Sequence, residues 1–128
     1  MGGSPGARSM TVLFADVVGS TALQSSLGDS RYDEIRRALM HALVNVVDTN
    51  GGTVVKTMGD GVMATFDSAL AALVAADGLL ASARHETRSR GLDQPIELRV
   101  GVSAGDVILD GRDVHGTPVV EAARLCAT

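Results

Sequence analysis

A nearly continuous run of apolar and β-branched residues, Thr11 to Val18, is the segment that most constrains the fold of this chain. Such a run is typical of a strand that is buried on both faces in the centre of a sheet. It contains a single carboxylate, Asp16, and ends at a glycine-containing turn. A second isolated carboxylate, Asp60, lies where another short strand reaches a glycine turn.

These two carboxylates predict a metal site. A carboxylate on an apolar strand is expensive to bury unless a cation or a hydrogen-bond donor pairs with it. If neighbouring strands bring Asp16 and Asp60 together, their charges repel, and a divalent cation between them resolves the conflict. For either residue alone, a turn or capping aspartate is the alternative interpretation.

The segment after the first strand predicts a phosphate site. Val17-Val-Gly-Ser-Thr21 leads into a predicted helix, where backbone N–H groups and the helix N-terminus favour an anion at Gly19, Ser20 and Thr21. Lys56 lies four residues before Asp60, so strand alternation places both on one face of the sheet. We therefore expect a cation and a carboxylate to face one metal-nucleotide ligand.

Periodicity and turn signals predict the order β-α-α-β-β-α-β-β-α and an α+β sandwich, a mainly antiparallel sheet with helices on one face. Asp-Gly at residues 60–61 predicts a hairpin. Residues 1–10 are expected to be a flexible leader, and residues 11–128 a single domain. The expected strands are 11–18, 53–58, 62–66, 96–104 and 106–109, with a break at Gly105. The expected helices are 20–27, 30–50, 68–88 and 118–128, the third with a core stripe of Leu70, Leu73, Val74 and Leu80.

Four stretches, read in order, resemble the class III nucleotidyl cyclase catalytic domain, the adenylate and guanylate cyclase homology domain. They are Phe14-Ala-Asp-Val-Val-Gly-Ser-Thr21, Lys56-Thr-Met-Gly-Asp-Gly61, Arg99-Val-Gly-Val-Ser-Ala-Gly105 and Asp113-Val-His-Gly-Thr-Pro-Val-Val-Glu-Ala-Ala-Arg-Leu125. The resemblance implies a ferredoxin-like βαβ sandwich, the nucleotide cyclase fold.

The resemblance also implies an activity and its residues. ATP would be converted to cyclic AMP and pyrophosphate with two Mg²⁺ or Mn²⁺ ions, held by Asp16, Asp60 and the backbone carbonyl of Val17. Lys56 and Asp113 match the two positions that read the purine. A lysine suits the N1 acceptor of adenine and an aspartate its amino group, so the pair implies ATP over GTP.

Further family features concern the transition state and the assembly. Arg124 matches an arginine that stabilises the transition state, whereas Val120 stands where many of these cyclases carry an asparagine. The family's domain continues with further strands and a late lysine beyond the end of this chain, so we expect weak turnover from these 128 residues. Related cyclases are homodimers with shared active sites, which we expect of the complete domain.

Composition excludes other classes of partner. A formal charge of −4 with two Phe, one Tyr and no Trp argues against nucleic-acid binding, and so against an RNA-binding module on a similar sandwich. No apolar run approaches membrane-spanning length, so we expect no membrane partner and a cytoplasmic location. The lone Cys126 is expected to be a buried thiol. A degenerate, non-catalytic cyclase homology domain that binds a metal-nucleotide or a partner domain remains the alternative function.

Overall fold

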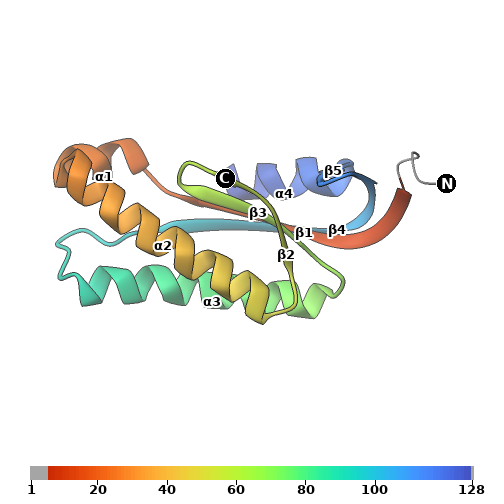
Figure 1. Ribbon diagram of the computed structural model, residues 1–128, viewed down its shortest axis with the longest axis horizontal. Coiled ribbons are helices and arrows are strands. Elements are labelled where there is room, and N and C mark those ends of the chain that lie inside the picture. Colours follow the sequence, from red (N-terminus) through yellow and green to blue (C-terminus); the bar gives the residue numbers. More distant parts are fainter. Residues whose placement is uncertain (1–5, 128) are drawn as a thin grey trace.

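A computed structural model describes residues 6–127 as a five-stranded antiparallel sheet with four helices (Figure 1). The strand order across the sheet is β2-β3-β1-β4-β5. The strands are β1 (Gly6–Val17), β2 (Thr53–Met58), β3 (Gly61–Phe66), β4 (Leu98–Asp110) and β5 (Asp113–His115). The helices are α1 (Ser20–Leu27), α2 (Asp29–Thr49), α3 (Ala69–Ser89) and α4 (Thr117–Ala127). This confirms the predicted element order and the α+β class.

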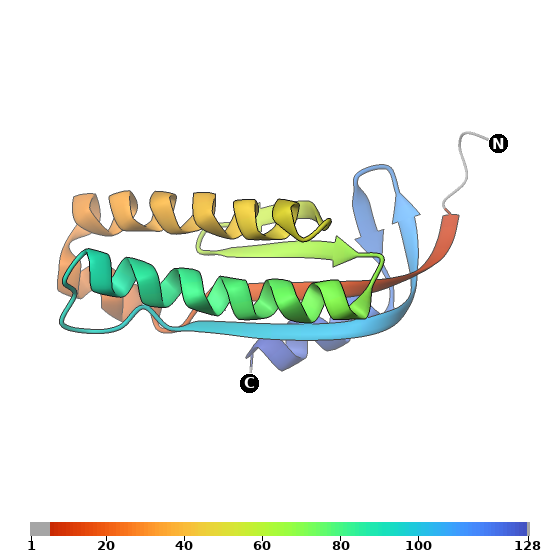
Figure 2. The same ribbon diagram turned by 90° about the horizontal axis from the view of Figure 1, so that it is seen from below.

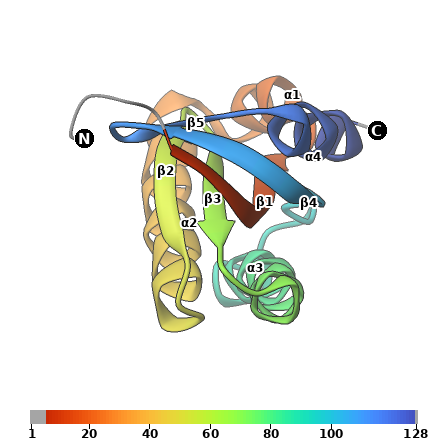
Figure 3. The same ribbon diagram turned by 90° about the vertical axis from the view of Figure 1, so that its right-hand side faces the viewer.

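The central strand β1 separates two apolar cores. Its side chains alternate between the faces, so Leu13 and Ala15 join the larger core under α2 and α3. Val12 joins a smaller core on the other face, together with Met63 and Ala122 of α4. Figure 3 shows α2 and α3 on one side of the sheet and α4 on the other. The two long helices therefore share one face, as expected, while α4 covers the opposite face.

The sheet is longer at one end than the sequence indicates. β1 begins at Gly6, because residues 6–10 pair with residues 105–109 of β4, so this part of the expected leader is strand. The remainder of the expected leader, residues 1–5, lies outside the described residues. β4 runs through Gly105 without a break, and it bends toward β5 at its far end (Figure 2).

The core face of α3 differs from the predicted leucine stripe. Leu70, Leu73 and Val74 are 71%, 57% and 52% exposed, whereas the buried residues of this helix are mainly small. They are Ala72, Ala75, Leu79 and Ala83. α2 and α3 lie side by side (Figure 2), and a Cβ at Gly78 of α3 would stand 2.9 Å from Val46 Cγ1 of α2. The close approach of the helices selects small side chains on the buried face.

Helix α4 lies directly on the backbone of β4. A Cβ at Gly101 would collide with the carbonyl of Ala122 and stand 2.5 Å from the amide nitrogen of Cys126. Glycine at position 101 therefore permits this contact. The contact fixes the height of α4 above the sheet and the place of Cys126 beside β4.

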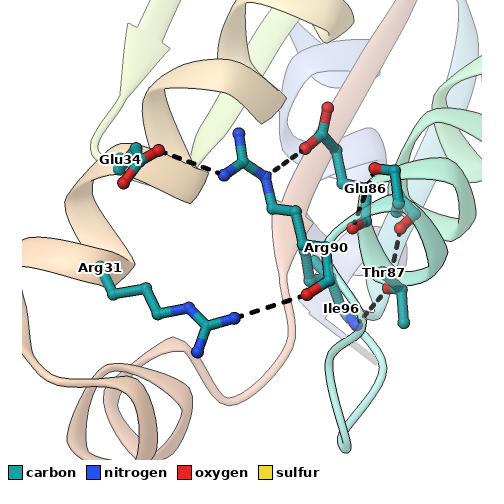
Figure 4. Close-up of polar contacts among 8 residues, drawn as sticks. Arg31, Glu34, Glu86, Thr87, Arg90 and Ile96 are labelled. Atoms are coloured by element: carbon teal, nitrogen blue, oxygen red, sulfur yellow. Dashed lines mark hydrogen bonds and ion pairs between the residues drawn. The ribbon is translucent and has the colours of Figure 1, made fainter.

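A polar network fixes the start of β4 (Figure 4). Arg90 donates from Nε to Glu86 at 2.7 Å and its Nη1 lies 3.5 Å from Glu34 of α2. The backbone amide of Ile96 donates to the hydroxyl of Thr87 at 2.9 Å. These contacts join the end of α3 to α2 and set the path of the chain into β4. None of the four described helices is long and apolar enough to cross a bilayer.

Candidate functional site

The turns that carry Asp16 and Asp60 lie side by side. Asp16 pairs with Gly61 in the β1–β3 ladder, and the backbone amide of Val17 donates to the carbonyl of Asp60 at 3.1 Å. Asp60 occupies the two-residue turn between Met58 and Gly61, which are paired. The antiparallel register therefore brings the two carboxylate-bearing positions to one end of the sheet, as the metal hypothesis requires.

Gly61 makes this approach possible. A Cβ at position 61 would stand 2.6 Å from the carbonyl oxygen of Ala15 and 3.1 Å from the Cβ of Asp16. The first of these contacts is with backbone, which cannot rotate away. Any side chain at position 61 would push the turn that holds Asp60 away from β1.

The predicted phosphate segment begins helix α1. Gly19 is the N-cap residue in the left-handed region, with φ of 61° and no side-chain capping bond, and Ser20 is the first helical residue. The amides of Val17 and Val18 already donate to the carbonyls of Asp60 and Glu97. The donors available for an anion therefore start at Gly19 and continue through the first turn, as at any helix N-terminus.

Asp16 has a carboxylate oxygen that would suit a cation. Its Oδ1 is buried and has no hydrogen-bond partner among the described residues. A buried carboxylate oxygen is rarely left unpaired, and hard cations such as Mg²⁺ prefer carboxylate oxygen ligands. The described residues contain no group of three or more His, Cys, Asp or Glu that could hold a metal, so Asp16 and Asp60 would need backbone, water or nucleotide oxygens to complete the coordination.

Arg99 lies next to Asp16 and was not identified as a site residue from the sequence. The two residues are paired in the β1–β4 ladder, and Nε of Arg99 is buried with no hydrogen-bond partner in residues 6–127. Its Nη1 donates to the carbonyl of Ala127 at 3.0 Å. Sequence reasoning missed this residue because only the long-range register between β1 and β4 places it there.

Cys126 lies on the buried face of α4 beside the same strands. Its Sγ donates to the carbonyl of Arg99 at 3.3 Å, and the side chain is 4% exposed. Burial, followed by the charge of Asp16, raises the pKa of Cys126 to about 11. The thiol therefore stays protonated near neutral pH, which agrees with the expectation of a buried cysteine.

The two predicted base-reading residues are brought together. Lys56 Nζ lies 3.8 Å from Asp113 Oδ1, with about half of each side chain exposed. Asp113 also accepts from the amide of Val114 at 2.9 Å, and this bond, followed by the charges of Lys56 and His115, lowers its pKa. The carboxylate is thus ionised and keeps lone pairs for a ligand.

Lys56 does not share a ligand with Asp60 in the way strand alternation predicts. Asp60 lies in the turn and not in the strand, and a register shift between Val54 and Lys56 alters the alternation of β2. The ammonium of Lys56 is paired with Asp113 on the far edge strand.

Arg124 is exposed on the outer side of α4, while Ala122 and Cys126 of the same helix face the sheet. Arg124 has no hydrogen-bond or ion-pair partner within residues 6–127. Val120, one turn earlier, is 51% exposed. Among the described residues Arg124 therefore forms no hydrogen bond or ion pair with Asp16 or Asp60 of its own chain.

Comparison with known proteins identifies the family of this chain. Residues 4–125 match the sequence model of the adenylate and guanylate cyclase catalytic domain. An adenylate cyclase of Streptomyces coelicolor is 35% identical over 118 residues, which span 92% of this chain and 29% of that protein. The chain spans less than a third of the length of the curated relatives it matches first.

Solved structures show the same fold. The guanylyl cyclase Cya2 superposes with a TM-score of 0.83 at 24% identity, over 99% of this chain and 72% of that one. An adenylate/guanylate cyclase/hydrolase from Silicibacter pomeroyi is 33% identical with a TM-score of 0.76, over 95% of this chain and 70% of its own. Both the predicted resemblance and the predicted fold are thereby confirmed: this chain belongs to the adenylate and guanylate cyclase catalytic-domain family.

Proposed function

We propose that this domain is an adenylate cyclase that converts ATP to cyclic AMP and pyrophosphate. The choice of ATP rests on one observation, the pairing of Lys56 with Asp113. An ammonium can donate to N1 of adenine and an ionised carboxylate can accept from its amino group, whereas guanine presents the opposite pattern on that edge. The exposed ion pair is weak, so a base can enter between its partners at little cost.

In the reaction, the ribose 3′-oxygen attacks the α-phosphorus, the bond from that phosphorus to the bridging oxygen of the β-phosphate breaks, and the 3′-hydroxyl proton is released. Two Mg²⁺ or Mn²⁺ ions, when bound, would activate the 3′-oxygen and neutralise the triphosphate. Asp16, Asp60 and the carbonyl of Val17 would hold them, and the unpaired Oδ1 of Asp16 supports this assignment.

The remaining residues bind and orient the nucleotide. The amides from Gly19 to Thr21 would hold phosphate oxygens, and the half-buried Arg99 adds positive charge beside Asp16. Arg124 would stabilise the negative charge that develops on the transferred phosphoryl group. Since Arg124 is exposed and forms no described bond with Asp16 or Asp60 of its own chain, we propose a homodimer in which each active site combines Asp16 and Asp60 of one chain with Lys56, Asp113 and Arg124 of the other.

One observation favours a second candidate. Val120 cannot form a hydrogen bond at the position where the family resemblance expects an asparagine, and its side chain is 51% exposed on the face of α4 that carries Arg124. A domain that retains the metal and nucleotide sites but not catalysis would tolerate this residue. In that case the chain would bind Mn²⁺ and ATP without turning over.

The direct test measures cyclic AMP and cyclic GMP formed from ATP and from GTP with Mn²⁺. We expect cyclic AMP to exceed cyclic GMP, with a rate that rises more steeply than protein concentration until the dimer is saturated. Equal use of both nucleotides would contradict the base assignment. Binding of Mn²⁺ and an ATP analogue without any cyclic product would favour the non-catalytic candidate.

A further inference from the structure

Helix α2 forms a hydrogen bond to the turn that holds Asp60. Arg36 Nη1 donates to the carbonyl of Gly59 at 2.9 Å, and its Nη2 donates to Asp33 at 2.9 Å. The two bonds use both arms of one guanidinium fork. Asp33 therefore orients Arg36, and Arg36 holds the backbone immediately before Asp60.

Tyr32, one helical turn before Arg36, contacts the same turn. Its side chain is 8% exposed, its hydroxyl lies beside Ser20 of α1, and burial followed by the charge of Asp60 raises its pKa. Residues four apart share one face of a helix, so Tyr32 and Arg36 present a single surface to both loops. Ser20, Tyr32, Asp33, Arg36, Gly59 and Asp60 are among the residues that line a cavity of about 370 Å³ there.

The hydrogen bond from Arg36 to Gly59 stabilises the turn in the metal-free chain. Asp16 and Asp60 carry like charges on adjacent turns, and repulsion between them favours a turn that swings away from β1. The opposing hydrogen bond is the one between the Val17 amide and the Asp60 carbonyl, at 3.1 Å. A guanidinium bonded to Gly59 adds a charge-assisted bond on the other side of the turn, where it also partly offsets the charge of Asp60.

We infer that Arg36 is a positioning residue, which holds the Gly59-Asp60 turn against β1 so that Asp60 can share a cation with Asp16. The inference rests on the proposed metal role of these two aspartates, but its structural half does not depend on catalysis. The described hydrogen bonds of Arg36 go to Gly59 and Asp33 and not to Asp16 or Val17, so its polar influence on the site passes through the turn.

Arg37 supplies a matched control. It pairs with the same Asp33, Nη2 to Oδ2 at 2.7 Å, but its side chain is 75% exposed and the described contacts do not extend to the turn. Arg36→Met and Arg37→Met each remove one arginine partner of Asp33 and one positive charge. Only the first removes the bond to Gly59. Arg36→Lys keeps the positive charge but removes the guanidinium group that bonds Gly59 and Asp33 at the same time.

The first measurement is amide hydrogen exchange in the metal-free chain. Because the Val17 amide bonds to Asp60, it reports opening of the turn, whereas the Val18 amide bonds to Glu97 at 2.8 Å and serves as a reference. We expect Arg36→Met to speed exchange at Val17 by about 10-fold or more, Arg36→Lys by less, and Arg37→Met not at all. The second measurement is Mn²⁺ affinity by electron paramagnetic resonance, which should weaken by a similar factor in Arg36→Met only.

Several results would overturn the inference. One is unchanged exchange at Val17 in Arg36→Met. Another is equal acceleration at Val17, Val18 and the core amide of Leu13, which would mean general destabilisation. A raised KM for ATP with unchanged Mn²⁺ affinity would instead make Arg36 a nucleotide contact. If the unsubstituted chain binds no Mn²⁺, the metal proposal fails, yet the exchange data still decide whether Arg36 holds the turn.

Discussion

Lys56 and Asp113 form an ion pair of 3.8 Å although their strands, β2 and β5, are the two opposite edges of the sheet. A flat five-stranded sheet would hold its edges roughly 19 Å apart, at about 4.8 Å per strand spacing. The contact therefore requires the sheet to curl and the end of β4 to bend, as Figure 3 shows. Two residues far apart in sequence and in strand order thereby become one candidate base-reading pair.

This pair should decide between purines. Replacing both residues, Lys56→Glu with Asp113→Gly, should shift the preference of the domain from ATP toward GTP by about 10-fold or more, because each mismatched polar partner costs on the order of 1–3 kcal/mol. Competition binding with ATP and GTP analogues measures the shift. Asp77 and Arg84, two exposed residues of α3, provide the control, Asp77→Ala with Arg84→Ala. Discrimination that is the same before and after the Lys56/Asp113 exchange would place the base elsewhere.

Removing the charge of Asp16 should separate metal binding from folding. Asp16→Asn retains the shape of the side chain but removes a charge whose Oδ1 is buried and unpaired. We expect Mn²⁺ binding to be lost while the free energy of unfolding stays the same or rises, because repulsion with Asp60 is relieved. Urea unfolding and Mn²⁺ titration check the two halves. Retained Mn²⁺ affinity in this variant would remove Asp16 from the metal site.

Gly61 should tolerate no side chain. Gly61→Ala places a Cβ 2.6 Å from the backbone oxygen of Ala15, so the turn must shift. We expect a loss of about 1–3 kcal/mol in the free energy of unfolding together with weaker Mn²⁺ binding. Gly6→Ala, where a Cβ meets nothing within 4 Å, is the neutral control. A Gly61→Ala chain as stable as the control, with full Mn²⁺ affinity, would show that the close approach does not matter.

The central strand, the hairpin at Asp60 and the alternation of elements could be predicted from local sequence. Apolar continuity indicates a buried strand, and Asp-Gly indicates a tight turn, whatever the rest of the chain does. The prediction of a core stripe on α3 was wrong for Leu70, Leu73 and Val74, which have helical spacing but are exposed. The buried side of that helix is selected by its close packing on α2, which favours alanine, and hydrophobicity alone does not reveal this.

Contacts between distant segments explain the other differences. Residues 6–10 contain Gly, Ser and Arg and carry no strand signal of their own, yet they pair with the extended β4. Arg99 beside Asp16 and Arg36 beneath Gly59 depend on ladder register and helix placement, which no local pattern encodes. The sequence therefore indicated which residues could bind metal or base, while the structure was needed to find the residues that orient them.

Cys126 should react slowly with thiol reagents. Burial and the nearby charge of Asp16 raise its pKa to about 11, so the thiolate is scarce below that pH in the folded chain. The raised pKa also stabilises the folded state below the unfolded pKa of about 8.5, and this contribution is lost as pH rises through 11. Iodoacetamide labelling followed by mass spectrometry should show a midpoint near the raised value in native protein and near 8.5 in urea. Rapid labelling of the folded chain at pH 8 would contradict this.

In the proposed homodimer, each active site combines the carboxylate pair of one chain with Lys56, Asp113 and Arg124 of a second. Mixing two variants tests this most directly: Asp16→Asn lacks the first half and Arg124→Ala lacks the second. Each alone should be inactive, whereas the mixture should recover about a quarter of the unsubstituted cyclic AMP formation, because half of the dimers are mixed and each holds one intact site. A mixture that stays inactive, although native mass spectrometry shows that mixed dimers form, would contradict the shared site.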